Sequence, residues 1–329
     1  MSDHLPLEGC LPSFGRHRTY PPRAGWLLKA HQAVLEDPQV FARPDAPVTL
    51  GVGSSMVPAL RFWSRAFGLT TDAPIGGPRA GLQPTRHGHW LLGEDGADPY
   101  LEDPGSLWLL HWWLLQPPCQ VPTWFQLFAL AGLSRLTRDE VRAGVQRDAV
   151  DSGWPAPSDS ALTRDITAFV SMYGPTPVPP GHEHAPVEEQ LSNPFRALNV
   201  LRVEEALGRH HRPGTQKLVI NRNAGRTVPA AVIAYACLTF ADRAAPGARS
   251  IALGRLRTDP GSPGRVLLLD SRTVQRALTQ IAESDPGLGL AVVDSGDEPT
   301  LTFRTRPNVL ADQVLAAHYQ LGRGPDSYR

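Results

Sequence analysis

Apolar side chains recur every three to four positions in several stretches of this chain, and that period predicts helices with one buried face. In residues 48–92 the repeat consists of Met56, Leu60, Trp63 and Phe67. A serine pair before this helix can begin it, and Gly68 can end it. Residues 81–92 then predict two short strands around a turn near His87 and Gly88. A helix followed by such a hairpin is the outline of a winged helix-turn-helix.

The same period predicts further helices at 23–35, 107–115, 124–130, 137–146, 158–170, 228–243, 271–283 and 309–319. Residues 137–140 read as a capping box, in which a threonine and a glutamate satisfy the first backbone groups of a helix. The run 107–115 is apolar all round, so we expect that helix to be buried between modules. A second hairpin is predicted from 288–294 and 300–304.

These elements predict an α+β fold, mainly helical, built of tandem winged helix-turn-helix-like modules with short β-hairpins. The first module covers residues 1–116 and includes an acidic segment, and a second helix-turn-helix module covers 117–177. A proline-rich linker is expected at 178–200, before a C-terminal winged-helix-like module at 201–329. A chain of 329 residues is long enough for modules of this size.

The overall charge gives no general attraction to nucleic acid, because 32 basic residues balance 32 acidic ones. Lys29 and Lys217 are the only lysines, as a GC-rich genome would favour, so arginine richness alone is a weak DNA signal. The 3 cysteines lie far apart, which indicates free thiols in a reducing compartment. The longest apolar run is shorter than the roughly 20 residues that cross a bilayer. We therefore expect a cytoplasmic protein with no membrane segment.

Local basic residues are more informative than the total charge. Residues 48–92 contain a single acid, Asp72, beside four arginines: Arg61, Arg65, Arg79 and Arg86. Such a helix and hairpin could place one helix in a major groove while the arginines hold phosphates. Ordinary solvated arginines on a small domain explain the same pattern about equally well.

The predicted helix at 158–170 is a second candidate for DNA contact. Ser160, Thr163 and Arg164 lie near its start, where small polar and basic side chains suit phosphates and base edges. A plain three-helix packing unit is an equally good interpretation. His17 is a candidate ligand or proton carrier, although a histidine that bonds a backbone group at a domain edge is the simpler interpretation.

The segment 94–103 carries five carboxylates in ten positions. Cleavage of a phosphodiester commonly uses Mg²⁺ or Mn²⁺ held by carboxylates. Asp95, Asp98, Glu102 and nearby His111 are therefore candidate catalytic residues, with Asp98 and Glu102 as the candidate metal ligands. A structural interpretation competes, because an aspartate before Pro104 can cap the next helix. The sequence has no glycine-rich phosphate loop, so no nucleotide cofactor is expected.

Several of these segments also carry a family resemblance. They are Phe14-Gly15-Arg16-His17-Arg18-Thr19-Tyr20, Arg61-Phe62-Trp63, the acidic residues 93–104 and Leu107-Trp108-Leu109-Leu110-His111-Trp112. Through them the chain resembles the SspB-like nickase family of bacterial DNA phosphorothioation systems, first catalogued as a domain of unknown function. The resemblance covers most of the chain and is strongest from Phe14 to Trp124.

The resemblance implies a DNA-binding protein of an anti-phage defence system. Such a protein would be a metal-dependent endonuclease that nicks one strand so that sulfur can enter the backbone. Its implied partners are double-stranded DNA, a cysteine desulfurase, an ATPase and a phosphoadenosine-phosphosulfate (PAPS) reductase-like enzyme, and a homodimer is compatible with the sequence. Two other interpretations stay open. One is a non-catalytic DNA adaptor or transcription-type regulator that recruits the sulfur-transfer enzymes, and the other is a protein-only scaffold.

Overall fold

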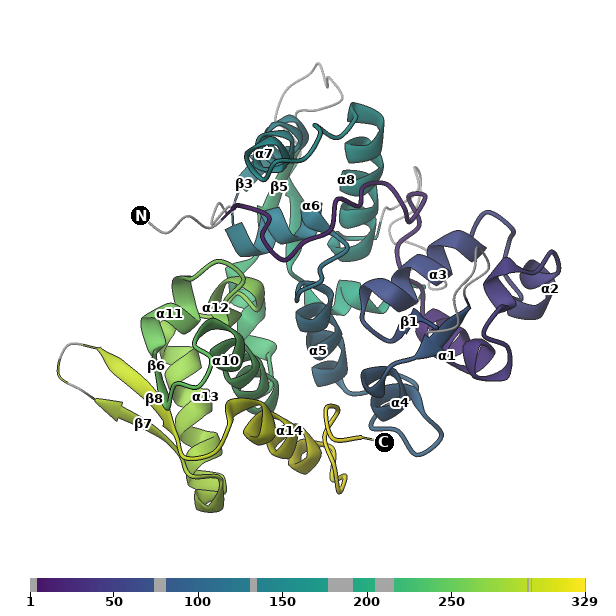
Figure 1. Cartoon of the computed structure of the whole chain (residues 1–329). Coiled ribbons are helices and arrows are strands. Elements are labelled where there is room, and N and C mark those ends of the chain that lie inside the picture. Colours follow the sequence, from purple (N-terminus) through teal and green to yellow (C-terminus); the bar gives the residue numbers. More distant parts are fainter. Residues whose placement is uncertain are drawn as a thin grey trace.

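The computed structural model describes residues 5–73, 81–130, 135–176, 192–204, 216–294, 296 and 298–328. Helices predominate, and the described strands form small antiparallel sheets (Figure 1). The predicted α+β class, mainly helical, is thus confirmed, whereas the tandem winged-helix modules stay a prediction. Among the described helices, none has the length and apolar character needed to cross a membrane.

The N-terminal unit contains α1 (Trp26–Glu36), α2 (Ala46–Leu50), α3 (Val57–Ala66), β1 (Thr70–Asp72), β2 (Leu82–Pro84) and α4 (Arg86–Leu92), with a 3-10 turn at Val40–Ala42. The hairpin predicted around His87 and Gly88 is wrong, because β1 pairs with β2 and the residues after β2 form α4. Thr85 begins α4 by accepting the Gly88 N–H at 3.0 Å. Gly88 has no side chain, which lets α4 approach the carbonyl of Leu69.

The middle unit contains α6 (Pro122–Phe125), a π-helical turn (Gln126–Leu130), β3 (Arg135–Thr137), α7 (Arg138–Asp151), α8 (Asp159–Tyr173), a 3-10 turn (Pro194–Leu198), β4 (Leu201–Glu204) and β5 (Lys217–Ile220). The predicted capping box is present at the start of α7. Thr137 accepts the Glu140 N–H at 3.2 Å, and Glu140 accepts the Thr137 N–H at 2.7 Å. The sheet order is β3-β5-β4, so this sheet joins strands from both sides of the predicted linker.

The C-terminal unit contains α10 (Ala230–Ala244), β6 (Ser250–Ala252), α11 (Leu253–Thr258), α12 (Pro263–Val266), α13 (Ser271–Ser284), β7 (Leu290–Asp294), β8 (Pro299–Phe303) and α14 (Pro307–His318), with 3-10 turns at Arg222–Thr227 and Pro286–Leu288. The three predicted helices and the hairpin of this region are confirmed within a few residues. The sheet order is β6-β8-β7, so the first strand pairs with the third, as in the middle unit.

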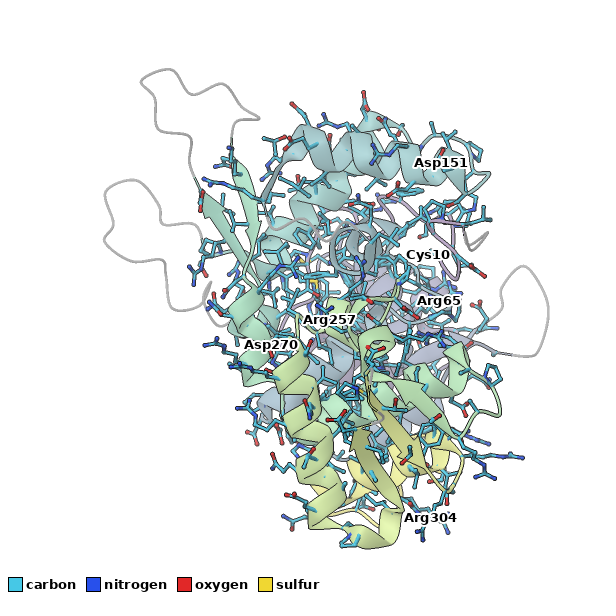
Figure 2. The ribbon with its side chains drawn as sticks, turned by 90° about the vertical axis from the view of Figure 1, so that its left-hand side faces the viewer. Cys10, Arg65, Asp151, Arg257, Asp270 and Arg304 are labelled. Carbon is cyan, nitrogen blue, oxygen red and sulfur yellow. The ribbon has the colours of Figure 1, made fainter. Side chains whose placement is uncertain are left out.

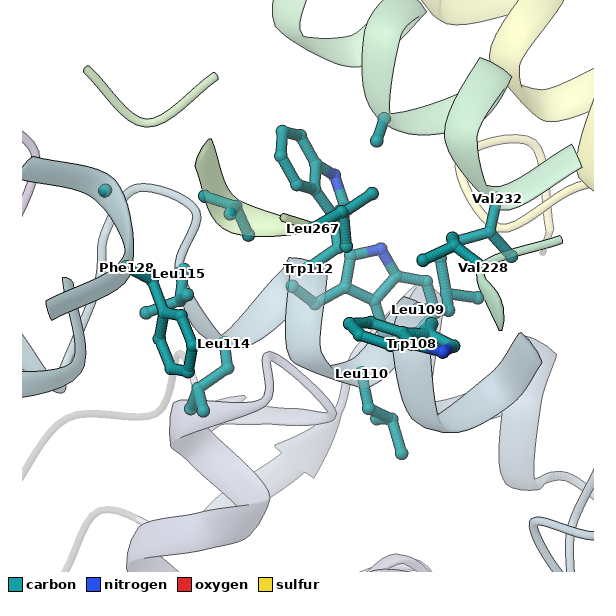
Figure 3. Close-up of a cluster of buried hydrophobic side chains, with 14 of the residues drawn as sticks. Trp108, Leu109, Leu110, Trp112, Leu114, Leu115, Phe128, Val228, Val232 and Leu267 are labelled. Carbon is teal, nitrogen blue, oxygen red and sulfur yellow. The ribbon is translucent and has the colours of Figure 1, made fainter. Parts of the chain in front are cut away.

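Helix α5 (Pro104–Leu114) lies where the three units meet (Figure 1). Asp103 caps it by accepting the Gly105 N–H at 2.6 Å, and the helix is buried from Gly105 to its end. Figure 3 shows Trp108 packed near Val228 and Val232 of the C-terminal unit. The predicted burial of this helix is confirmed. The helix is apolar on all sides because every side packs against the core, and no side faces solvent.

Candidate nucleic-acid interface

An open cleft of about 1030 Å³ lies between the loop 13–20, helix α3 and the start of α8. Its lining includes five arginines and no acidic residue: Arg16, Arg18, Arg61, Arg65 and Arg164. The aromatic side chains of Tyr20, Phe41 and Phe62 line it as well. Guanidinium groups on one concave surface create a positive potential there, although the chain as a whole is neutral.

A buried aspartate in α8 holds the loop that forms one wall of the cleft. Asp165 accepts three hydrogen bonds, from the Gly15 N–H at 2.7 Å, from His17 Nε2 at 2.9 Å and from the Thr123 hydroxyl at 2.7 Å. The His17 ring also stacks on Trp63 of α3, with 5.5 Å between ring centroids. Because these groups come from the N-terminal segment, α3, α6 and α8, the loop has one defined position against both helices of the cleft.

The two residues after His17 have an uncommon backbone conformation. Arg18 and Thr19 are both left-handed, with φ values of 50° and 68°. This region disfavours non-glycine residues, and β-branched ones such as threonine most strongly. The surrounding contacts fix the backbone, since Trp63 Nε1 donates to the Tyr20 carbonyl at 2.8 Å just beyond the pair. The strained turn thus holds Arg18 at the cleft.

The arginines of the cleft differ in their ion pairs. Asp72 on β1 lies 2.6 Å from Arg65 and 3.9 Å from Arg61, and all three side chains are partly exposed to solvent. Within the described part of the chain, Arg16, Arg18 and Arg164 form no ion pair within 4.0 Å. These three exposed guanidinium groups are therefore available to an anion without the loss of an internal ion pair.

The structure brings together three of the arginines selected from the sequence. Arg61, Arg65 and Arg164 line one cleft although they come from different units. Ser160 and Thr163 are exposed on the first turns of α8 but do not line it. Arg79 lies outside the described residues. The sequence interpretation missed Arg16 and Arg18 as site residues. The run of Arg16, His17 and Arg18 is a local basic cluster that could have indicated them.

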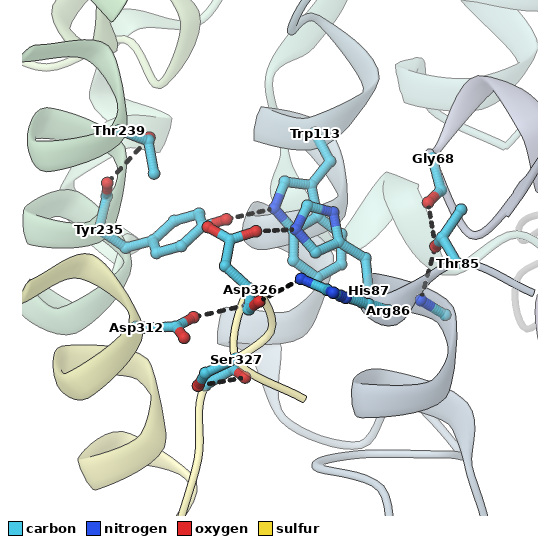
Figure 4. A network of polar contacts seen from close by, with 12 residues as sticks. Gly68, Thr85, Arg86, His87, Trp113, Tyr235, Thr239, Asp312, Asp326 and Ser327 are labelled. Atoms are coloured by element: carbon cyan, nitrogen blue, oxygen red, sulfur yellow. Dashed lines mark hydrogen bonds and ion pairs between the residues drawn. The ribbon is translucent and has the colours of Figure 1, made fainter. Parts of the chain in front are cut away.

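Arg86 lies elsewhere, under the C-terminal segment (Figure 4). It donates to the Asp326 carbonyl at 3.1 Å, and His87 Nε2 lies 3.0 Å from the Asp326 carboxylate. The Asp326 N–H in turn donates to Asp312 of α14 at 2.7 Å. Arg86 is exposed but does not line the cleft, and its described contacts hold the last residues of the chain against α4.

The acidic segment does not form a ligand cluster. Asp98 is buried, and its two carboxylate oxygens accept the N–H groups of Glu102 and Asp103, each at 2.9 Å. The side chains of Asp95 and Glu102 are exposed. In the part of the chain that the structure describes, no three His, Cys, Asp or Glu residues are grouped so as to hold a metal ion. Asp98 already satisfies two backbone N–H groups, and the role of Asp98 and Glu102 as metal ligands stays a prediction.

His111 is also part of the core and not of an open site. Its Nε2 donates to the Val266 carbonyl at 3.0 Å, which leaves Nδ1 to accept the Tyr173 hydroxyl at 2.7 Å. Complete burial lowers the pKa of His111 to about 4, although the bond to Val266 acts in the opposite direction. The ring is thus neutral near pH 7, and it ties α5 to both the middle and the C-terminal units.

The fold and the cleft define an α+β protein of small antiparallel sheets around a central apolar helix, with a concave basic surface beside it. Residues 14–319 match a family described as "Protein of unknown function (DUF4007)". The chain belongs to this family.

Two solved structures are similar to the chain over almost its whole length. One is a crystal structure of SspB, with 36% identity, a TM-score of 0.84 and coverage of 95% of this chain and 90% of that chain. The other is a crystal structure of magnesium ion-bound SspB, with 38% identity, a TM-score of 0.85 and the same coverage. No curated protein sequence matches the chain significantly. These likenesses agree with the SspB-like family that the sequence resembles.

Proposed function

We propose that this chain is a DNA-binding protein of a bacterial DNA phosphorothioation and anti-phage defence system, and that its basic cleft holds the phosphates of the duplex. The likeness to SspB supports the system. The observation that supports DNA contact most directly is the cleft itself, with five arginines and no acid in its lining. Planar guanidinium groups bind phosphate oxygens through two parallel hydrogen bonds, and they remain charged at any physiological pH.

The geometry favours an extended polyanion over a small ligand. The cleft is open and its arginines come from three separate segments, so their charges spread along a surface. Binding of a phosphate breaks no ion pair of Arg16, Arg18 or Arg164. The same event at Arg61 and Arg65 replaces their ion pairs with Asp72 by contacts to phosphate. A duplex offers many phosphates in a row, and each phosphate that is neutralised releases condensed counterions.

The test is the salt dependence of binding to a fluorescent duplex. The triple variant Arg16→Ala/Arg18→Ala/Arg164→Ala should bind at least about tenfold more weakly, with a slope of log K against log salt that is lower by roughly 0.9 for each phosphate that the variant no longer neutralises. The matched control is Arg202→Ala/Arg304→Ala/Arg306→Ala, which removes the same charge from exposed arginines outside the cleft that likewise form no ion pair within 4.0 Å among the described residues. Equal losses of affinity in both triple variants would contradict a role for the cleft.

The nick in one strand is a separate hypothesis. It is supported by the family resemblance and by the magnesium ion in one of the similar structures. Supercoiled plasmid incubated with the protein and Mg²⁺, Mn²⁺ or EDTA tests it directly. Open-circle product that needs the metal would support a nickase. Binding without nicking would support the adaptor, which would recruit the desulfurase, the ATPase and the PAPS reductase-like enzyme to DNA.

A further inference from the structure

Helix α13 presents a long polar face to solvent. Its other face is buried, with Val274, Ala277 and Leu278 in the core. The exposed side forms a shallow groove of about 400 Å³ that is lined by Arg272, Gln275, Arg276, Thr279, Gln280 and Glu283. Figure 2 shows this helix on the outside of the molecule, with Asp270 and Arg257 near its start. The stripe runs for three turns without an apolar side chain, so burial in the protein core does not explain it.

The elements around α13 follow a definite order. They run helix α10, strand β6, helices α11 and α12, helix α13 and then strands β7 and β8, with β8 between the other two strands. In winged helix-turn-helix proteins this order places the last helix before the hairpin against DNA, where its exposed face enters the major groove. In the C-terminal unit, α13 occupies the position of that recognition helix, directly before the hairpin of β7 and β8.

The start of α13 adjoins a second basic pocket. This pocket has a volume of about 430 Å³ and is lined in part by Arg222, Arg226, Arg257 and Arg265, together with Ser271 and Thr273 of α13. Within the described residues, Arg226 and Arg257 form no ion pair within 4.0 Å. Asp270 is the one acid in the lining, and it accepts the Thr273 N–H at 2.7 Å as the cap of α13. The start of α13, whose polar face is exposed to solvent, therefore lies beside a pocket with the charge to bind a phosphate.

The corresponding helices of the other two units are less suited to the same role. In α3 Pro58 is exposed and every other residue is half-buried or buried, because the helix forms the wall of the first cleft and packs into the core. In α8 the exposed residues are confined to the first two turns. Among these three helices, α13 alone has both arginine and glutamine side chains exposed along its length. Arginine forms bidentate hydrogen bonds with guanine, and glutamine forms them with adenine.

We propose that α13 reads base sequence in the major groove of double-stranded DNA. Arg272, Gln275 and Arg276 contact base edges, and Arg226 and Arg257 hold the adjacent backbone. This inference rests on the proposed DNA-binding function and adds to it which element selects the sequence. The first cleft contributes affinity that does not depend on sequence, and α13 contributes the preference.

The experiment is selection of bound duplexes from a random library, followed by affinity measurements on the selected site and on a scrambled duplex. The wild-type chain should enrich a short motif. Gln275→Ala/Arg276→Ala should lose roughly ten- to a hundredfold in the ratio of affinities for the two duplexes, with little change on the scrambled one. Both side chains are exposed, so the variant should fold normally. The control is Gln313→Ala/Arg323→Ala, which removes the same side-chain types from exposed positions outside α13.

The outcomes separate the two proposals. Loss of the preference with retained binding to the scrambled duplex supports α13 as the reader. If the wild-type chain binds DNA without any preference, or the α13 variant keeps the motif, the inference is overturned while the proposed DNA-binding function stands. If the wild-type chain binds no DNA at all, both fail. The inference is also overturned if the α13 variant and the control variant lose the same factor in the ratio of affinities for the selected and the scrambled duplex.

Discussion

His17 Nε2 lies 2.9 Å from the Asp165 carboxylate, although 148 positions separate the two residues in the chain. Both side chains are 2% exposed. The pair joins the N-terminal segment to α8, and it fixes the loop that presents Arg16 and Arg18 to the cleft. One buried interaction thus sets the geometry of the basic surface.

Removal of this pair should cost stability and DNA affinity together. Asp165→Ala leaves His17, the Gly15 N–H and the Thr123 hydroxyl without their shared acceptor, so the free energy of unfolding should fall by about 3–5 kcal/mol. Urea unfolding measures this loss, and duplex binding by the remaining folded protein should weaken. Asp151→Ala, at an exposed position, should change stability by no more than about 0.5 kcal/mol. A loss below about 1 kcal/mol in Asp165→Ala would show that the pair is not needed.

The stability of the protein should decrease as the pH falls from about 6.5 to about 4. Burial lowers the pKa of His111 to about 4, while in the unfolded chain it lies near 6.5. Between these values the unfolded form binds a proton that the folded form excludes, so His111 alone removes up to about 3 kcal/mol, and above 6.5 it has no effect. Burial and, to a lesser extent, His89 lower the pKa of His31 to about 4 as well, which adds to the loss.

Urea unfolding at a series of pH values measures this effect. His111→Gln can still donate to the Val266 carbonyl and accept from Tyr173, but it cannot be protonated. Its stability should therefore decline less steeply than that of the wild-type chain from pH 6.5 to 4. Parallel curves would contradict the assignment, because other titrating groups are shared by both proteins.

Gly88→Ala should destabilise the N-terminal unit. An alanine usually favours a helix by about 1 kcal/mol over glycine, but here its Cβ would lie 2.2 Å from the Leu69 carbonyl oxygen. The overlap forces α4 away from that strand connection, at a cost of about 1–3 kcal/mol. Thermal unfolding should show a lower Tm than wild type. Gly53→Ala is the control, since its Cβ would meet nothing closer than 3.9 Å. A rise in Tm for Gly88→Ala would refute the close approach.

Asp98→Ala separates a structural role from a metal-binding one. It removes the acceptor of two backbone N–H groups ahead of α5, so we expect a loss of about 1–3 kcal/mol in urea unfolding and unchanged duplex affinity. Asp95→Ala and Glu102→Ala remove exposed carboxylates and should be nearly neutral. A stable Asp98→Ala protein that loses metal-dependent nicking would instead assign Asp98 to the metal.

The sequence alone determined the elements whose signals are local. The period of apolar residues located α5, α8 and α13 within a few positions, and the capping box of α7 is formed by side chains three residues apart. The complete apolar surface of α5 also predicted its burial. The false hairpin at His87 and Gly88 shows the limit of local signals, because Gly88 serves a contact with Leu69 that lies outside its own segment.

Only the tertiary structure determined which arginines form the basic cleft and which groups the carboxylates of the acidic segment contact. Arg18, Arg61 and Arg164 become neighbours because Asp165 and Trp63 hold the N-terminal loop against α3 and α8, and no periodic pattern encodes contacts over such separations. Likewise, the carboxylate of Asp98 is buried and satisfies two backbone N–H groups that would otherwise lack partners, whereas Asp95 and Glu102 are exposed to solvent. Helices follow from local propensity and burial, whereas a site depends on which distant side chains the packing brings together.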